Sequence, residues 1–171
     1  MGAQMKRVIS VIAGGLAIGH AVAATVTAEV KTTSNSTPIG MVEFVDTEYG
    51  LLIKPDLTSL NPGIHGFHIH QHPNCEHAGM SAAGHFDPQK TDKHKGPYSN
   101  GHLGDLPALY VDQSGSAKQA ILAPRLKTSD IINHSVMIHE GGDNYSDKPA
   151  ALGGGGSRAA CGLIQGQASN K

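Results

Sequence analysis

The sequence predicts an all-β domain, either a sandwich or a barrel, and three observations support this fold class. About eight short stretches alternate apolar and polar residues and are rich in β-branched side chains, and none has a convincing helical period. Glycine and proline are frequent, at 22 and 9 residues, which suits short strands joined by turns. The 171 residues are enough for one ordinary domain, and without tryptophan its core must come mainly from Val, Ile, Leu and Ala.

The predicted strands follow one another with turns or loops between them. Pro55 is expected to end the third strand, because proline has no N–H to donate to a sheet. The fifth and sixth strands flank the turn 113–116 and are expected to pair as a hairpin. In chain order the predicted strands are 25–34, 39–46, 49–55, 64–71, 108–112, 118–122, 135–139 and 159–165.

Residues 1–23 have the pattern of a secretory signal that is removed from the mature protein. Lys6 and Arg7 precede an apolar stretch, 8–18, which is followed by the small residues 21–23. A buried N-terminal helix is the alternative, and the apolar stretch is too short to span a bilayer. We therefore expect an exported domain at 24–171, which contains no segment long and apolar enough for a membrane span.

The charge of the chain argues against nucleic acid as a partner. The full sequence has 13 basic and 14 acidic residues. Without Lys6 and Arg7 the count is 11 against 14, a net charge of −3, and no basic block remains.

The two cysteines, Cys75 and Cys161, are expected to form a disulfide. A single pair in an exported chain is usually oxidised, and a cross-link across a long loop stabilises a fold. Two free buried thiols are the alternative.

The eleven histidines suggest a metal protein, and His68 and His70 are the first candidate ligands. Residues two apart on a strand point to the same face, so both rings can approach one ion. Two core histidines without a metal are the alternative. His65 lies an odd step from His68, so we expect it to face the other way and to bridge backbone groups.

The segment 72–106 has no regular period, and so long an irregular stretch inside a domain is usually functional. It must be held by something other than regular hydrogen bonds, and metal ligation together with a disulfide would do this. Imidazole nitrogens and one carboxylate suit Zn²⁺ and Cu²⁺, and so many donors suggest two metals. The further candidate ligands are His85, His94, His102, Asp105 and His139.

The chain resembles copper/zinc superoxide dismutases of the bacterial exported type through seven motifs that occur in the family's order. They are Gly66-Phe-His-Ile-His70, Gly84-His-Phe-Asp-Pro88, His94-Lys-Gly-Pro97, Gly101-His-Leu-Gly-Asp105, Val136-Met-Ile-His-Glu140, Gly141-Gly-Asp143 and Gly156-Ser-Arg-Ala-Ala-Cys-Gly162. The resemblance implies an eight-stranded antiparallel Greek-key barrel, related to immunoglobulin-like sandwiches, with two long functional loops.

The resemblance also assigns one copper and one zinc per subunit, with His85 bridging both metals as imidazolate. Asp143 matches a carboxylate that joins the copper-side and zinc-side histidines. Arg158 matches the residue that attracts and orients the anionic substrate, and the disulfide would fix the metal loop beside it. The implied copper ligands are His68, His70, His85 and His139; the implied zinc ligands are His85, His94, His102 and Asp105.

The activity implied is the conversion of two superoxide anions to O₂ and H₂O₂ by copper redox cycling. His85 would carry a proton during the cycle. The resemblance implies a periplasmic location, where the enzyme would protect the cell envelope. The family includes homodimers and monomers, so a homodimer is possible. An exported copper or zinc carrier on the same scaffold is the alternative.

Some residues depart from the family pattern. The gap 76–84 is wider than in cytosolic eukaryotic enzymes, and His72 and His77 are extra histidines that we interpret as solvated, with an accessory metal contact as the alternative for His72. Lys148 is the candidate for steering substrate. Arg125 and His134 are interpreted as surface residues.

Overall fold

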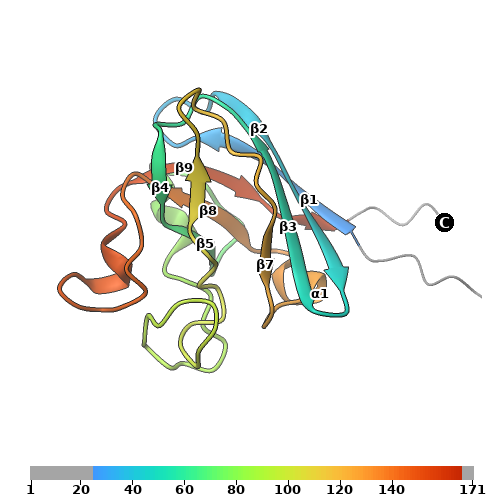
Figure 1. Ribbon diagram of the computed structural model, residues 1–171, viewed down its shortest axis with the longest axis vertical. Helices are drawn as coiled ribbons and strands as arrows, with labels where there is room; N and C mark the ends of the chain where they lie inside the picture. Colours follow the sequence, from blue (N-terminus) through green and yellow to red (C-terminus); the bar gives the residue numbers. More distant parts are fainter. Residues whose placement is uncertain (1–24, 167–171) are drawn as a thin grey trace, which may run out of the picture.

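Ten strand segments make up most of the regular structure in residues 25–166, the residues that the computed structural model describes (Figure 1). The predicted signal at 1–23 lies outside the described residues. The strands are β1 (Thr25–Thr32), β2 (Pro38–Thr47), β3 (Gly50–Leu57), β4 (Gly63–His65), β5 (Phe67–His70), β6 (Leu109–Val111), β7 (Ile121–Ala123), β8 (Ser135–His139), β9 (Arg158–Leu163) and β10 (Gln165–Gly166).

The strands form one curled antiparallel sheet in the order β5-β8-β9-β1-β2-β3-β7, with β10 added to β1 and a separate β4–β6 pair. Every pairing is antiparallel, which confirms the predicted architecture. Strands far apart in sequence are neighbours, for example β1 with β9 and β3 with β7, as long Greek-key connections require.

The core lies inside the curl of the sheet and is mainly aliphatic, as the composition predicts. Along β1, Val26, Ala28 and Val30 are buried, and the residues between them are not, because side chains alternate faces along a strand. Phe44 and Phe67 supply the largest fully buried side chains. Burying each large apolar side chain contributes roughly 1.5–3 kcal/mol.

The strand predicted at 64–71 is two strands that belong to different sheets. β4 pairs with β6, and β5 pairs with β8. The change occurs at Gly66, whose N–H donates to Gly141 O at 2.7 Å and whose carbonyl accepts from His139 N–H at 2.8 Å. The alternation changes phase at Gly66, since the apolar positions are Ile64 before it and Phe67 and Ile69 after it, but this shift does not reveal which strands become the new neighbours.

Pro55 does not end its strand, which was a wrong prediction, because β3 continues to Leu57. The N–H of Leu57 donates to Ala117 O, away from β2, and residues two apart point the same way. The missing N–H of Pro55 therefore faces the side that β2 does not use, where proline is tolerated.

The predicted hairpin was also wrong, because β6 pairs with β4 and β7 pairs with β3. Only the turn forms, with Asp112 N–H donating to Ser116 O at 2.9 Å. One short α-helix, α1 (Thr128–Ile131), was not predicted, because four residues are too few for a helical period.

Two long loops, 71–108 and 140–157, follow β5 and β8, the first at the bottom of Figure 1 and the second at its left. They contain only two 3₁₀ segments among the described residues, Met80–Ala82 and Ala151–Gly154. Within residues 25–166, no helix has the length and hydropathy needed to cross a membrane.

Candidate metal centre

Four histidines from two paired strands and a loop meet at one point. His68 and His70 come from β5, His139 ends β8, and His85 comes from the first long loop. One ligand atom from each lies within 4.8 Å of the others, and all four residues are buried. We call His68, His70, His85 and His139 the four-histidine cluster.

Each ring in this cluster is fixed through one nitrogen and has a second, buried nitrogen without a hydrogen-bond partner. His70 Nδ1 donates to Ala83 O at 2.8 Å, and His139 Nδ1 donates to Gly156 O at 3.1 Å. Because a carbonyl only accepts, these nitrogens carry the protons, and the Nε2 atoms keep free lone pairs. Buried lone pairs without donors are what a metal ion requires, so the residues fit a bound metal.

A second group shares His85 with the first and is centred on a carboxylate. Asp105 Oδ1 lies 2.9 Å from His85 Nδ1, 3.0 Å from His94 Nδ1 and 3.3 Å from His102 Nδ1. The other oxygen, Oδ2, accepts the N–H groups of the segment 95–96. Three imidazoles and one carboxylate fit Zn²⁺ in a tetrahedral site. We call His85, His94, His102 and Asp105 the Asp105 cluster.

Asp143 connects the two clusters. Its Oδ2 accepts from His68 Nε2 at 2.8 Å, and its Oδ1 accepts from His94 Nε2 at 2.8 Å. Gly153 packs so closely here that a Cβ atom would lie 2.1 Å from Asp143 Oδ1, and its φ is +76°. A residue without a side chain is therefore needed at this position, where the backbone approaches Asp143 closely.

The two clusters differ in how they affect protonation. Burial lowers the pKa of His68 to about 3 and of His70 to about 2, and burial also lowers that of His139 to about 4. Burial opposes charge on His94 as well, but the carboxylates of Asp105 and Asp143 outweigh it and raise the pKa of His94 to about 9.

His85 and His102, the remaining two histidines, shift in opposite directions. Burial lowers the pKa of His85, although Asp105 opposes the change. The contact with Asp105 raises the pKa of His102. Burial would raise the pKa of Asp105, but the surrounding histidines lower it well below its usual range.

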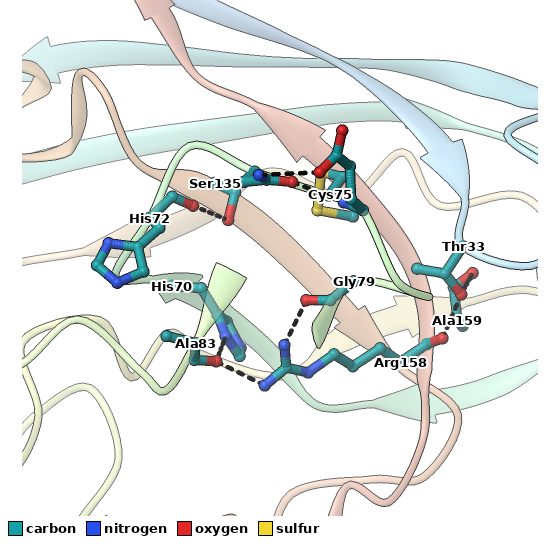
Figure 2. The surroundings of a disulfide bond; sticks show 12 residues. Thr33, His70, His72, Cys75, Gly79, Ala83, Ser135, Arg158 and Ala159 are labelled. Carbon is teal, nitrogen blue, oxygen red and sulfur yellow. Dashed lines mark hydrogen bonds between the residues drawn. A yellow bond between two sulfur atoms is a disulfide. The ribbon is translucent and has the colours of Figure 1, made fainter. Parts of the chain in front are cut away.

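The disulfide between Cys75 and Cys161 is present, as predicted, and joins the first long loop to β9 (Figure 2). Arg158 lies nearby on β9 and donates to the carbonyls of Gly79 and Ala83, the latter at 2.6 Å. Figure 2 shows that the Ala83 carbonyl receives both Arg158 and His70. Ala83 has φ 62° and ψ −147°, a conformation that L side chains rarely adopt.

A surface cavity of about 450 Å³ reaches this point from solvent. His139 and Arg158 lie in its wall together with Met80 and Leu152. The cavity therefore gives a small anion a route to the guanidinium and to one ring of the four-histidine cluster. Lys148 is exposed and does not belong to the described lining, so its steering role has no support here.

The other singled-out residues lie outside both clusters. The ring of His65 lies between two backbone carbonyls, with Nδ1 2.7 Å from His139 O and Nε2 2.7 Å from Asn61 O, which confirms its bridging position. His72 and His77 are exposed. The interpretation of His134 as a surface residue was wrong, because it is half-buried, bonds to His70 O at 3.1 Å and contacts the ring of Phe86.

Arg125 was also misinterpreted as a surface residue. It is half-buried, and its guanidinium donates to Gly101 O at 2.9 Å and to His102 O at 3.3 Å. No motif marks it in the sequence, since its partners are main-chain carbonyls more than twenty residues away.

The fold and the site define a β-barrel metalloprotein with two adjacent centres that share one histidine. The family model described as "Copper/zinc superoxide dismutase (SODC)" matches residues 38–164. The chain belongs to this family.

Individual relatives agree with this assignment. The superoxide dismutase [Cu-Zn] of Legionella pneumophila is 56% identical over 146 residues, which cover 85% of this chain and 90% of the relative. The solved Cu/Zn superoxide dismutase from Brucella abortus is 39% identical, with a TM-score of 0.78 and coverage of 82% of this chain and 99% of the relative. A monomeric relative from Salmonella enterica is 45% identical, with a TM-score of 0.73 and coverage of 83% and 100%.

Proposed function

We propose that this protein is a superoxide dismutase whose four-histidine cluster holds copper and whose Asp105 cluster holds zinc. One observation carries the proposal: His85 belongs to both clusters. Its Nδ1 lies beside Asp105, and its Nε2 is buried without a partner, so one imidazole can serve two metals. When bound, copper supplies one-electron redox chemistry, by which two superoxide anions and two protons become O₂ and H₂O₂.

The residues around the clusters have separate tasks in this proposal. Arg158 attracts and orients the anion, since its positive charge lines the cavity beside His139. With zinc at its Nδ1, His85 would hold a proton at Nε2 while that nitrogen is not coordinated. Asp143 keeps His68 and His94 in the orientation that leaves their other nitrogens free for metal.

The direct test is superoxide removal by protein reconstituted with copper and zinc. We expect a rate constant approaching the diffusional limit of about 10⁸–10⁹ M⁻¹s⁻¹, falling as salt rises because the attraction is electrostatic. Stopped-flow or pulse-radiolysis decay of superoxide measures it.

The second candidate is an exported copper or zinc carrier on the same scaffold. The presence of Arg158 in the cavity wall favours the enzyme, because a carrier has no need to attract an anion. Intact, copper-loaded protein that leaves superoxide unchanged would establish the carrier instead.

We propose further that residues 1–23 direct export and that 24–171 act in the periplasm against superoxide outside the cytoplasm. The bacterial relatives and the disulfide support this, since such bonds persist in oxidising compartments. Cell fractionation of the full chain, with mass spectrometry of the mature N-terminus, tests the location and the cleavage together. Full-length protein that stays in the cytoplasm contradicts it.

We propose that two copies form a homodimer through one apolar groove of about 480 Å³. Tyr98 and Tyr110 are 72% and 47% exposed there, with Ile64 and Leu122 beside them. Exposed aromatic and aliphatic side chains gathered on one face are typical of interfaces. Sedimentation velocity should give a dimer, and Tyr110→Lys should give a monomer; a wild-type monomer, like the Salmonella relative by its title, would contradict the proposal.

A further inference from the structure

One histidine of the two clusters, His102, is held differently from the other five. Four of the six rings form a hydrogen bond through the nitrogen that faces away from their candidate metal. The fifth, His85, has one nitrogen in each cluster. The outer acceptors are a carboxylate for His68 and His94 and a carbonyl for His70 and His139. Such partners fix the ring and raise its basicity.

His102 lacks a partner of this kind among the described residues. Its Nδ1 faces Asp105 Oδ1 at 3.3 Å, the longest of the three contacts to that oxygen, and this buried nitrogen has no hydrogen-bond partner. No residue within 25–166 forms a hydrogen bond with its Nε2. Its side chain is also the most exposed in the Asp105 cluster, at 9%. The position of this ring must therefore be set mainly through its backbone.

Three groups hold the backbone of His102, and one of them is the N–H of Asp105, which donates to His102 O at 3.4 Å. The N–H of His102 donates to Lys93 O at 2.9 Å. On the other side, Arg125 donates through Nη2 to Gly101 O and through Nη1 to His102 O. Gly101 packs closely there, since a Cβ atom would lie 2.5 Å from Lys93 O, so this short segment has little room to move.

Arg125 is itself anchored on the barrel rather than on the loop. It follows β7 and Pro124, and a Cβ atom at Gly50 would lie 2.5 Å from Pro124 Cα, so the two backbones are in close contact. The next residue, Leu126, is buried in the core. The guanidinium therefore anchors the loop that carries His102 to the sheet.

We propose that Arg125 is a positioning residue for zinc, because its two-pronged contact with the Gly101 and His102 carbonyls replaces the outer hydrogen bond that the His102 ring lacks. The inference rests on the proposed role of His102 as a zinc ligand. A planar guanidinium reaches two carbonyls at once, which an ammonium does less well.

The test compares zinc release from variants. Arg125→Ala should release zinc to a chelator about tenfold faster or more, in the range that loss of an outer partner has at metal sites. Arg125→Lys should lie between Arg125→Ala and wild type. The matched control is Lys127→Ala, which also removes a bond to a main-chain carbonyl, Thr47 O, but far from the Asp105 cluster.

A second readout separates positioning from general stability. Cobalt(II) in the zinc site should give a changed visible spectrum in Arg125→Ala and an unchanged one in Lys127→Ala, even if both melt at a similar temperature. Equal zinc release and equal cobalt spectra in the two variants would overturn the inference. If Arg125→Ala does not fold, Arg125→Lys against Lys127→Ala decides in the same way. Wild-type protein that binds no zinc would instead overturn the proposed function.

Discussion

At the scale of residues, the geometry of each buried histidine determines which nitrogen is free. The carbonyls of Ala83 and Gly156 each face one nitrogen and so force the proton onto it. Preorganisation of this kind means that little rearrangement is needed when a metal arrives, which raises affinity. The same holds for His68 and His94 through Asp143.

Replacing His85 tests whether one residue serves both clusters. His85→Ala should alter the copper absorption spectrum and also weaken binding at the zinc site, because the ring contributes a nitrogen to each. Metal content and spectra of the reconstituted variant measure this. His72→Ala, an exposed histidine nearby, should leave both unchanged. If the content and spectrum of only one metal change, His85 does not bridge the two sites.

Replacing Arg158 tests attraction of the anion. Arg158→Ala should lower the rate of superoxide removal about tenfold or more and flatten its dependence on salt, because a local charge at the cavity is lost. Lys118→Ala removes an exposed charge paired with Asp56 and should change neither. An Arg158→Ala enzyme that keeps the salt dependence of wild type contradicts the assigned role.

At the scale of elements, the second long loop is built around contacts with the clusters. Asp143 lies near its start, and Gly153, near its end, packs against the Asp143 carboxylate, so the two parts of the loop are in contact. Two hydrogen bonds stabilise this contact: the N–H of Tyr145 donates to Asp143 Oδ1, and the N–H of Asn144 donates to Gly153 O. The loop is ordered without regular secondary structure because these hydrogen bonds and the close packing replace it.

Two adjacent glycines offer a controlled test of this packing. Gly153 and Gly154 both have φ +76°, but a Cβ atom would lie 2.1 Å from Asp143 Oδ1 at the first and 3.6 Å from any neighbour at the second. Both Gly→Ala variants should lose stability through backbone strain, by roughly 1 kcal/mol. Only Gly153→Ala should also weaken metal retention and change the spectra, and equal effects would show that its contact with Asp143 does not matter for the metals.

The elements show what could be predicted from sequence and what could not. The strands, the ligand spacing on β5 and the irregular stretch 72–106 follow from local patterns and were predicted. The split at Gly66, the separation of β6 from β7 and the place of Pro55 depend on which strand becomes the neighbour, and no local pattern records that. The contacts of Arg125 could not be predicted for the same reason, because its partners are carbonyls far away in the sequence.

At the scale of the whole molecule, the clusters couple stability to pH. A histidine whose pKa is lowered on folding binds more protons when unfolded, so its contribution is complete above pH 6.5 and is lost as pH falls. A histidine whose pKa is raised contributes below pH 6.5 and loses that contribution as pH rises through its folded value.

The metal-free protein should therefore be most stable near pH 6.5. The free energy of unfolding should fall toward pH 3, because the unfolded chain protonates three histidines that the folded protein keeps neutral, namely His68, His70 and His139. It should fall again toward pH 9, as His94 loses its proton in the folded protein. Urea midpoints at pH 4, 6.5 and 9 measure this. His94→Gln should reduce the alkaline fall and leave the part that belongs to His102, whose pKa is also raised; an unchanged fall in that variant contradicts the assignment.

The sharing of His85 and Asp143 between the clusters has a consequence for how the protein acquires its metals. An ion at one centre fixes groups that the other centre also needs, and so raises affinity there by some factor. Thermodynamic reciprocity requires the second ion to raise affinity for the first by that same factor. Acquisition is then cooperative, and a shortage of either element weakens the hold on both.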